Sequence, residues 1–484
     1  MVNVCYLISH GFAARMVLHS DLVSELSGRG LTTAIITPNA HEGPMQDLAA
    51  ELGVELHGPR VRQRLASSLA HDQLQRYVFE NVESNPALYA KHLRELNGSG
   101  SRRWQRIVAK AMMGLNRAAR RHPRLPDTVA RVQEGLLTSA DVEQQLRAMN
   151  PDVVVATYPA NFVEATYLHQ AQRLGIKTAA HLLSWDNITC KGRFPVLAEY
   201  HVAWGPIMSD ELQEHYDTDP ERIFECGVPH FDAHVRGVDP SKRTKVIRQL
   251  GLDPDHHYLF FGMSSPYFAP HEIDIVEWLA RQVEAGAFGQ DTQLVIRPHP
   301  QNVSGNMADE SWLGRLQKLK SARVAVDIPR IQKKSRLMWN MQRDDLSRLA
   351  TLLSGCAITI NSGSTLCIDA MIHDRPVIIT AFDADADLPW YLSARRCVEY
   401  PHLAKLVSLE GLRVARSFDE LSDQIRAYLD DPATDQDGRA RSRAQECGPC
   451  DGRAAARVAD AFAELVERHS PLDAPPPPFA QSQV

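Results

Sequence analysis

The chain lacks any long hydrophobic run. No stretch approaches the roughly 18 to 20 consecutive apolar residues that a membrane-spanning helix needs. The first residues, MVNVCYLISHGFAARMVLHS, include an apolar segment but neither a basic n-region nor a small-residue cleavage site. The start is therefore typical of a first strand and not of an export signal, and we expect a cytoplasmic protein.

Paired cysteines are almost absent as well. The chain has eight cysteines, scattered singly except for Cys447 and Cys450 in CGPC. A CxxC motif can serve redox chemistry or supply half of a zinc site, but no second pair and no spaced histidine pair accompanies it. Reduced thiols are the favoured interpretation, with redox or metal use as the alternative. We expect neither an essential metal nor a cofactor.

There is no excess of positive charge. The chain has 53 Lys and Arg against 59 Asp and Glu, for a net charge of -6. Nothing global therefore suggests a nucleic-acid partner. The composition, 44% hydrophobic and 23% charged, is that of a globular protein, and 484 residues are too many for one ordinary core. We expect two or three domains.

Short β-branched runs alternate with helical patterns in two successive regions. In the first region we predict strands at residues 3–9, 32–37, 152–157, 177–183 and 199–204. In the second we predict strands at residues 257–263, 293–298, 323–329, 356–361 and 376–380. Nearly continuous apolar strands separated by helices indicate parallel sheets covered on both faces. The predicted fold class is α/β, with two Rossmann-like, doubly wound domains facing a shared cleft.

The domain boundaries follow from this alternation of predicted strands and helices. We predict an N-terminal acceptor domain at 1–205, interrupted by a helical insertion at about 61–149, and a crossing segment at 206–235. A nucleotide-donor domain at 236–432 and C-terminal helices at 433–469 follow. The Pro-rich tail at 470–484 is expected to be disordered.

Donor-rich residues follow three predicted strands of the second domain. Ser362, Gly363, Ser364 and Thr365 form a small turn that opens a helix, where backbone amides favour a phosphate. An ordinary Ser/Thr cap is the alternative. The other members of the predicted phosphate site are Arg297 as a bidentate fork, His299 as a donor of a hydrogen bond or proton, and Ser264 and Ser265. Asp369, farther along the helix, is a candidate for ribose contact or an ordinary surface aspartate.

The strand at 177–183 ends in SWDNITCKG. Asp186 follows Trp185 and precedes Asn187, with Lys191 nearby, and we predict that these three neighbours lie at the acceptor site or line the cleft. An Asp-Asn pair after a strand often forms an Asx-turn. A carboxylate in an apolar cleft beside a tryptophan can instead have a raised pKa, which suits a general base. We favour Asp186 as the catalytic base.

A second polar segment follows the first predicted strand. Gly11 permits close backbone approach to a ligand, and His10 and Arg15 are candidates for contact with donor or acceptor. His10 is the second-choice base, because a single histidine here is as often a turn residue.

The motifs ECGVPHFD, RPHP and NSGSTLCIDAMIHDRPVI resemble GT-B glycosyltransferases, nearest to the branch of CDP-glycerol glycerophosphotransferases and bacterial surface-polysaccharide enzymes. UDP-N-acetylglucosamine 2-epimerases share the same two-domain plan. Where the polyol-phosphate transferases have a His-Gly segment, this sequence has a run containing Asp186. The resemblance therefore implies inverting transfer of a sugar from a nucleotide-sugar to a glycan or lipid-linked hydroxyl, without an essential metal.

Other functions stay open at this point. The alternatives are a polyol-phosphate transferase, a nucleotide-sugar 2-epimerase and a non-catalytic nucleotide-binding module. An epimerase needs several carboxylates around the sugar, and the sequence offers none that we can assign beyond Asp186.

One segment of the insertion is strongly basic. Between residues 99 and 126 there are eight Lys and Arg and no acidic residue, from Arg102 to Arg124. Apolar residues such as Trp104, Ile107 and Val108 fall largely on another face at helical spacing. The segment 102–124 is a candidate for peripheral contact with anionic lipid. A solvated basic face packed on the N-terminal domain is the alternative.

Overall fold

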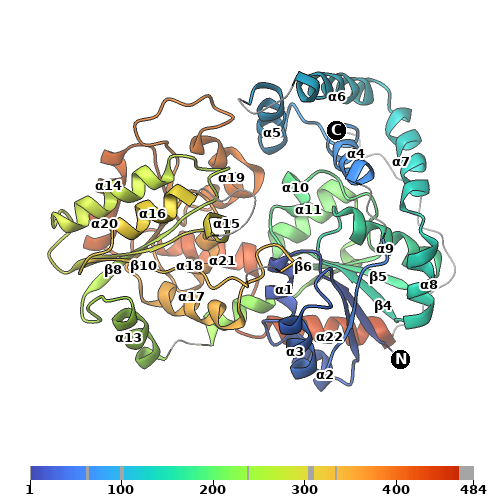
Figure 1. Cartoon of the computed structure of the whole chain (residues 1–484), viewed down its shortest axis with the longest axis horizontal. Coiled ribbons are helices and arrows are strands. Elements are labelled where there is room, and N and C mark those ends of the chain that lie inside the picture. The colour runs from blue at the N-terminus through green and yellow to red at the C-terminus, as the bar shows by residue number, and fades with distance from the viewer. Residues whose placement is uncertain are drawn as a thin grey trace. The chain divides into compact units, whose positions relative to one another are not determined.

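The computed structural model describes residues 2–61, 65–98, 103–236, 239–303, 310–332 and 335–467. These residues divide into two compact units (Figure 1). The first contains residues up to 230 together with 335–338 and the stretch from 453, and the second contains the rest of 231–452. The change of unit therefore lies inside the crossing segment predicted at 206–235. Arg102 and the Pro-rich tail lie outside the described residues.

The first unit is built on a parallel sheet of seven strands in the order β3-β2-β1-β4-β5-β6-β7. Its strands are β1 Val4–Leu7, β2 Thr33–Ile36, β3 Glu55–His57, β4 Val153–Ala156, β5 Lys177–His181, β6 Tyr200–Ala203 and β7 Ile223–Glu225. Every residue of β1, β2, β4 and β5 is buried, as expected for strands covered on both faces. The strand order reverses between β1 and β4, which makes that point the topological switch of the sheet.

Helices cover both faces of this sheet. One face packs on α1 Gly11–Val17, α2 Leu22–Gly28, α3 Gly43–Leu52 and α22 Ala454–Glu467. The other packs on α8 Ala140–Met149 and α9 Phe162–Arg173. Figure 1 shows α22, at the red end of the colour scale, beside the blue α2. A helix from the end of the chain thus completes the first core.

The insertion between β3 and β4 is helical. It contains α4 Leu65–Tyr77, α5 Pro86–Asn97, α6 Arg103–Arg121, α7 Arg124–Leu137 and α8. The Asn85 side chain caps α5 by accepting from the amides of Ala87 and Leu88. The first unit also contains α10 Asn187–Cys190, α11 Pro206–Tyr216 and the 3-10 turn η1 Pro220–Arg222, and η2 Pro229–Phe231 follows at the change of unit.

The second unit has a parallel sheet of six strands in the order β10-β9-β8-β11-β12-β13. Its strands are β8 His257–Gly262, β9 Thr292–Arg297, β10 Val324–Val326, β11 Ile358–Asn361, β12 Val377–Thr380 and β13 Arg413–Ala415. Here the order reverses between β8 and β11. Each sheet therefore has one switch point, where ligands of open α/β sheets bind.

The helices of the second unit again form two layers. One face carries α14 Glu272–Glu284, α16 Glu310–Lys318 and α20 Phe418–Asp430. The opposite face carries α17 Arg343–Gly355 and α18 Leu366–Ile372 (Figure 1). The remaining elements are α12 Asp232–Val235, α13 Pro240–Gln249, α15 Pro300–Val303, η3 Ala394–Glu399, α19 Pro401–Ser408 and α21 Gln436–Cys447.

The predicted fold class of two Rossmann-like, parallel-sheet domains is confirmed. All ten predicted strands overlap an observed strand, but β3, β7 and β13 were not predicted. Each of these has three residues and pairs at the outer part of its sheet. Most of their residues are partly or fully exposed, so these strands lack the apolar run that identifies a buried strand. Among the described helices, none is long and apolar enough to cross a membrane.

Candidate functional site

A buried glutamate joins the two strands at the switch point of the first unit. Glu164 on α9 is 1% exposed. Its Oε2 accepts from the amides of Thr157 at 2.8 Å and Tyr158 at 2.7 Å, just past β4. Its Oε1 accepts from the amide and hydroxyl of Ser9, just past β1. Burial raises the pKa of Glu164, and these hydrogen bonds oppose the rise.

The predicted base, Asp186, lies in an ion pair. It follows β5, and its Oδ2 is 2.7 Å from Lys191 Nζ. The Ser184 hydroxyl donates to Asp186 Oδ1 at 2.7 Å. Burial by itself would lower the pKa of Lys191, but the charge and hydrogen bond of Asp186, together with Tyr158 and Cys190, outweigh burial and raise that pKa above its ordinary value. The carboxylate is 19% exposed, so solvent reaches a fixed and charged pair.

The two neighbours of Asp186 have packing roles. Trp185 is 5% exposed and Asn187 is 1% exposed. Asn187 Oδ1 accepts from the amide of Ser184 at 3.1 Å and so closes the turn. Their burial does not fit the predicted contact with an acceptor, and we assign both residues to shaping the loop that carries Asp186.

His10 caps α1 through a ring nitrogen. Its Nδ1 accepts from the amide of Phe12 at 3.2 Å. Burial, followed by the positive charge of Lys191, lowers the pKa of His10 to about 4, so the ring is neutral near pH 7. A neutral ring that accepts at Nδ1 carries its proton at Nε2. His10 is therefore arranged as a hydrogen-bond donor, which corrects its prediction as a second-choice base.

The other residues of this segment lie on α1. The amide of Gly11 donates to the carbonyl of Met338 at 3.0 Å, so this backbone group already has a partner within the unit. Arg15 lies in the last turn of α1 and is half-buried. Their predicted contact with a ligand remains a prediction.

Two residues near Asp186 were not predicted from the sequence. Tyr158 follows β4, and burial raises its pKa to about 12, with opposing contributions from Lys191 and Asp186. Lys91 lies on α5, which is tied to this loop by a hydrogen bond of 2.7 Å from Asn85 Nδ2 to the carbonyl of Thr189. Burial lowers the pKa of Lys91 to about 8, and Lys191 contributes to the lowering. Tyr158 follows a predicted strand, whereas no sequence pattern relates Lys91 to residues a hundred positions away.

The second unit repeats the glutamate bridge. Glu272 on α14 is 1% exposed. Its Oε2 accepts from the amide of Ser264, past β8, at 2.6 Å, and its Oε1 accepts from the hydroxyl of Ser362, past β11, at 2.6 Å. Burial raises the pKa of Glu272 to about 7. Ser264 and Ser362 are buried and hold the scaffold together at the switch point.

The turn after β11 has the predicted open backbone. Gly363 adopts φ 90°, and its amide donates to Asn361 Oδ1 at 2.7 Å. A Cβ at Gly363 would lie 2.8 Å from Leu403 Cδ1, so glycine is required for both conformation and space. Ser364 and Thr365 follow at the start of α18 and are partly exposed. They are the hydroxyl-bearing residues of the motif that are not fully buried.

Ser265 and His299 lie in the neighbouring strand-end loops. The hydroxyl of Ser265 accepts from the amide of Tyr267 at 3.3 Å, as in a Ser turn, and Ser265 is buried. His299 follows β9 and is partly exposed, and its Nδ1 accepts from the amide of Gln301 at 3.1 Å. As for His10, this bond places the proton of the neutral ring on Nε2, which suits the donor role predicted for His299.

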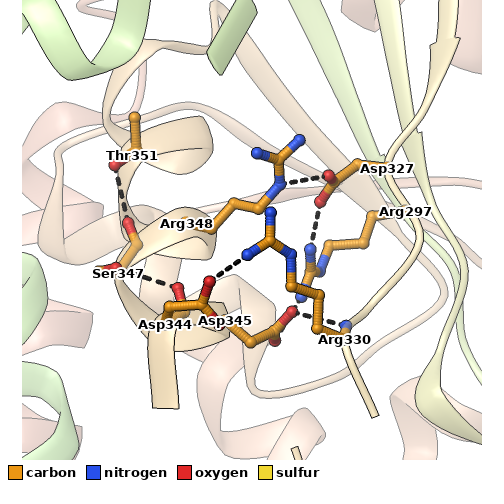
Figure 2. A network of polar contacts seen from close by, with 8 residues as sticks. All are labelled: Arg297, Asp327, Arg330, Asp344, Asp345, Ser347, Arg348 and Thr351. Atoms are coloured by element: carbon orange, nitrogen blue, oxygen red, sulfur yellow. Dashed lines mark hydrogen bonds and ion pairs between the residues drawn. The ribbon is translucent and has the colours of Figure 1, made fainter. Parts of the chain in front are cut away.

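Arg297 does not present a fork to solvent (Figure 2). Its Nη1 pairs with Asp327 and its Nη2 pairs with Asp345 at 2.6 Å, in a side chain that is 7% exposed. Arg348 adds a second cation on Asp327 at 2.6 Å. Both ends of the Arg297 guanidinium are thus bound to buried carboxylates, which corrects the predicted phosphate fork. RPHP begins at a structural arginine that fixes β9 to α17.

Asp369 is also directed into the protein. Its side chain is 3% exposed, and its Oδ1 lies 3.6 Å from His234 Nε2. His234 Nδ1 in turn lies 3.0 Å from His373 Nε2. This burial between α12 and α18 corrects the predicted ribose contact. Among the described residues, no group of three or more His, Cys, Asp or Glu side chains is placed to hold a metal ion.

The sequence matches no protein-family model and no curated protein. The structure is similar to the S. aureus MnaA–UDP co-structure, with a TM-score of 0.56, 12% identity and 96% of each chain covered. It is also similar to UDP-GlcNAc 2-epimerase from Neisseria meningitidis bound to UDP-GlcNAc, with a TM-score of 0.54, 10% identity, and 96% of this chain and 100% of that chain covered. A glycosyltransferase from Rickettsia africae gives a TM-score of 0.50 at 11% identity over 97% and 99% of the two chains.

At these identities the similarity establishes the fold. The chain has the GT-B-type fold that the sequence predicted, and both epimerases and glycosyltransferases occur among its structural neighbours. The relation to the CDP-glycerol branch stays a prediction. Because one fold hosts several reactions, the residues at the two switch points have to distinguish among them.

Proposed function

We propose that the chain is a glycosyltransferase that transfers a sugar from a nucleotide-sugar to a hydroxyl of a glycan or lipid-linked acceptor in bacterial surface-polysaccharide synthesis. The observation that carries this proposal is the partly exposed Ser364–Thr365 turn at the switch point of the second sheet, where open α/β folds bind ligands. The fold similarity to a protein in complex with UDP supports uridine diphosphate as the leaving group.

The second unit is suited to a diphosphate that is held without a buried arginine. Gly363 keeps the backbone open, and the hydroxyls of Ser364 and Thr365 can donate to phosphate oxygens. His299 can donate from Nε2 to the same group. Fixed donors of this kind stabilise the charge that develops on a departing phosphate.

The first unit supplies the groups for proton transfer. Asp186 takes the proton of the acceptor hydroxyl while the acceptor oxygen forms a bond to the anomeric carbon. The bond from that carbon to the diphosphate oxygen breaks, and its electron pair leaves with the nucleoside diphosphate. Lys191 and Ser184 hold the Asp186 carboxylate in one orientation. A positioned base of this kind contributes about 10²–10⁴-fold to the rate.

The test is incubation of the full chain with UDP-sugars, with and without membrane extracts or oligosaccharides as acceptors, followed by mass spectrometry of both substrates. The proposal predicts UDP release and an acceptor gaining one sugar, both dependent on the acceptor. Transfer from CDP-glycerol in place of a sugar donor would instead assign a polyol-phosphate transferase. UDP binding without turnover on any donor would assign a non-catalytic module.

A nucleotide-sugar 2-epimerase is the second candidate. The fold similarity to UDP-GlcNAc 2-epimerases favours it, and it needs no acceptor. Besides Asp186, the first switch point offers Lys191, Tyr158 and His10 as groups that can hold or donate a proton. Formation of an epimer from UDP-GlcNAc alone, detected by NMR of the sugar, would assign this function and contradict transfer.

A further inference from the structure

Helix α6 has a complete inner face that packs on its own unit. Ala109, Met113 and Ala119 are buried at 2%, 7% and 4% exposure. Met113 packs in the small core formed with Tyr77 and other residues of the insertion. Asn116 Nδ2 donates to the carbonyls of Tyr77 at 2.9 Å and Glu80 at 2.6 Å. The inner face alone therefore explains why α6 stays attached to the insertion.

A second apolar face of α6 points to solvent. Trp104 is 57% exposed, Ile107 67% and Val108 42%, and Ala111 is also exposed. These four residues have the spacing i, i+3, i+4, i+7 and so form one stripe along the helix, the outer apolar stripe. Trp104, Ile107 and Val108 are three of the six large exposed hydrophobic residues in the described part of the chain. Packing within the unit does not account for them.

Cations border this stripe. Arg103, Arg106, Lys110 and Arg121 are exposed and fall on the side of α6 next to the outer apolar stripe; together they form the basic stripe. None of these four has an ion-pair partner among the described residues, whereas Arg117 is paired with Glu83 at 2.6 Å. Figure 1 shows α6 running between α5 and α7 as one uninterrupted helix. With 19 residues it spans about 28 Å, enough to lie along a flat surface.

We propose that α6 docks on the surface of a bilayer that contains anionic phospholipid. A helix that lies in a membrane interface combines an apolar stripe, which enters the headgroup region, with adjacent Lys and Arg that meet the phosphates. Trp104 is the residue type that concentrates at that boundary, because its ring is apolar and its N–H is polar. The proposal is independent of the proposed function, since it uses residues outside both switch points.

Other occupants fit this surface less well. A second copy of the chain, meeting through a two-fold axis, would place the basic stripe against itself. Nucleic acid would engage the cations but would leave Ile107 and Val108 in water. An anionic bilayer satisfies both stripes at once, since it offers negative phosphates above an apolar layer.

The test uses the full chain with vesicles of phosphatidylcholine, with and without phosphatidylglycerol. We expect sedimentation with the phosphatidylglycerol vesicles, weakened by salt, together with a blue shift of tryptophan emission as Trp104 leaves water. The double variant Ile107→Ser, Val108→Ser should bind these vesicles at least about tenfold more weakly, because apolar burial drives insertion. Arg106→Glu with Lys110→Glu should remove the preference for phosphatidylglycerol.

A matched control is available on α7. Val132 is 63% exposed, like Ile107, but it lies on α7 and not on the helix that carries the basic stripe. Val132→Ser should bind vesicles as the parent chain does. Because all substituted residues are exposed, circular dichroism and thermal midpoints should be unchanged.

Four results would overturn the proposal. The first is the absence of binding by the parent chain to phosphatidylglycerol vesicles. The second is an equal loss of binding in the α7 control. The third is a parent chain that is dimeric, with the Ile107 and Val108 double variant monomeric, which would make the face an interface between copies. The fourth is binding to RNA that is lost with the charge reversals while vesicle binding is kept.

Discussion

The two switch points of this protein share one scaffold and differ in what they expose. In each, a buried glutamate on a neighbouring helix bridges the two strands where the order reverses, Glu164 in the first unit and Glu272 in the second. Around Glu164 lies a charged pair, Asp186 with Lys191, that solvent can reach. Around Glu272 the partly exposed residues at the strand ends include Ser364, Thr365 and His299.

This difference separates the chemistry of the units. A charged pair beside a neutral histidine suits proton transfer. Neutral donors on an open backbone suit the binding of an anionic group. In the second unit the buried Arg297 is held by Asp327 and Asp345 and fixes the backbone, so it is not among the groups that solvent reaches.

The largest effect is expected at Asp186. Asp186→Asn removes the base without changing size and should lower kcat about 100-fold or more, with UDP affinity unchanged. Initial rates and isothermal titration with UDP measure the two quantities. Asp385→Asn, at an exposed turn of the second unit, is the matched control and should keep full activity. Equal kcat for Asp186→Asn and the parent chain would contradict the claim that the first unit supplies the catalytic base.

Substitution of Arg297 tests whether this arginine stabilises the fold or binds a ligand. Arg297→Met leaves Asp345 buried without its cation and Asp327 with Arg348 alone, and should destabilise the second unit by about 3–5 kcal/mol, measured by denaturant unfolding. Arg330 belongs to the same network but is 47% exposed in its pair with Asp344, and Arg330→Met should cost about 1 kcal/mol or less (Figure 2). If Arg297→Met had normal stability but bound UDP weakly, the result would support the predicted role of Arg297 as a bidentate phosphate ligand.

The hydroxyls of Ser364 and Thr365, after Gly363, test whether the second unit binds the nucleotide. The double variant Ser364→Ala, Thr365→Ala should weaken UDP binding about tenfold, since each lost hydrogen bond to a charged group costs about 1 kcal/mol or more. Titration calorimetry measures the change. Ser408→Ala, at an exposed helix end of the same unit, should bind as the parent does. Unchanged affinity in the double variant would argue against this turn as the phosphate site.

The bridging glutamate of the second unit gives a smaller effect that depends on pH. Its folded pKa of about 7 lies above the ordinary value of 4.5, so the folded state holds a proton that the unfolded state has lost. Its contribution to stability is therefore complete below about pH 4.5 and decreases as pH rises to about 7. A plot of thermal midpoint against pH should therefore fall less steeply between about pH 4.5 and 7 for Glu272→Gln than for the parent chain. Glu164→Gln should change the slope in the same direction, since the pKa of Glu164 is also raised.

The sequence predicted the fold well because buried parallel strands carry continuous apolar runs, such as VVVA in β4. It also pointed to the loops that follow those strands, and their role as a ligand site stays a prediction. It did not predict which way their side chains turn. Arg297 and Asp369 were assigned to ligands, yet their partners Asp345 and His234 are far away in sequence and show no pattern with them. The bridge by Glu164 was missed because its partner Ser9 is 155 positions away in sequence.

Hydrogen exchange of the full chain with and without UDP tests the central claim most directly. If the second switch point binds the nucleotide, amides near Ser265 and over residues 362–366 should exchange more slowly with UDP, and those at 186–191 should change little. Protection confined to 186–191, or no protection in either unit at saturating UDP, would contradict the assignment of nucleotide binding to the second unit.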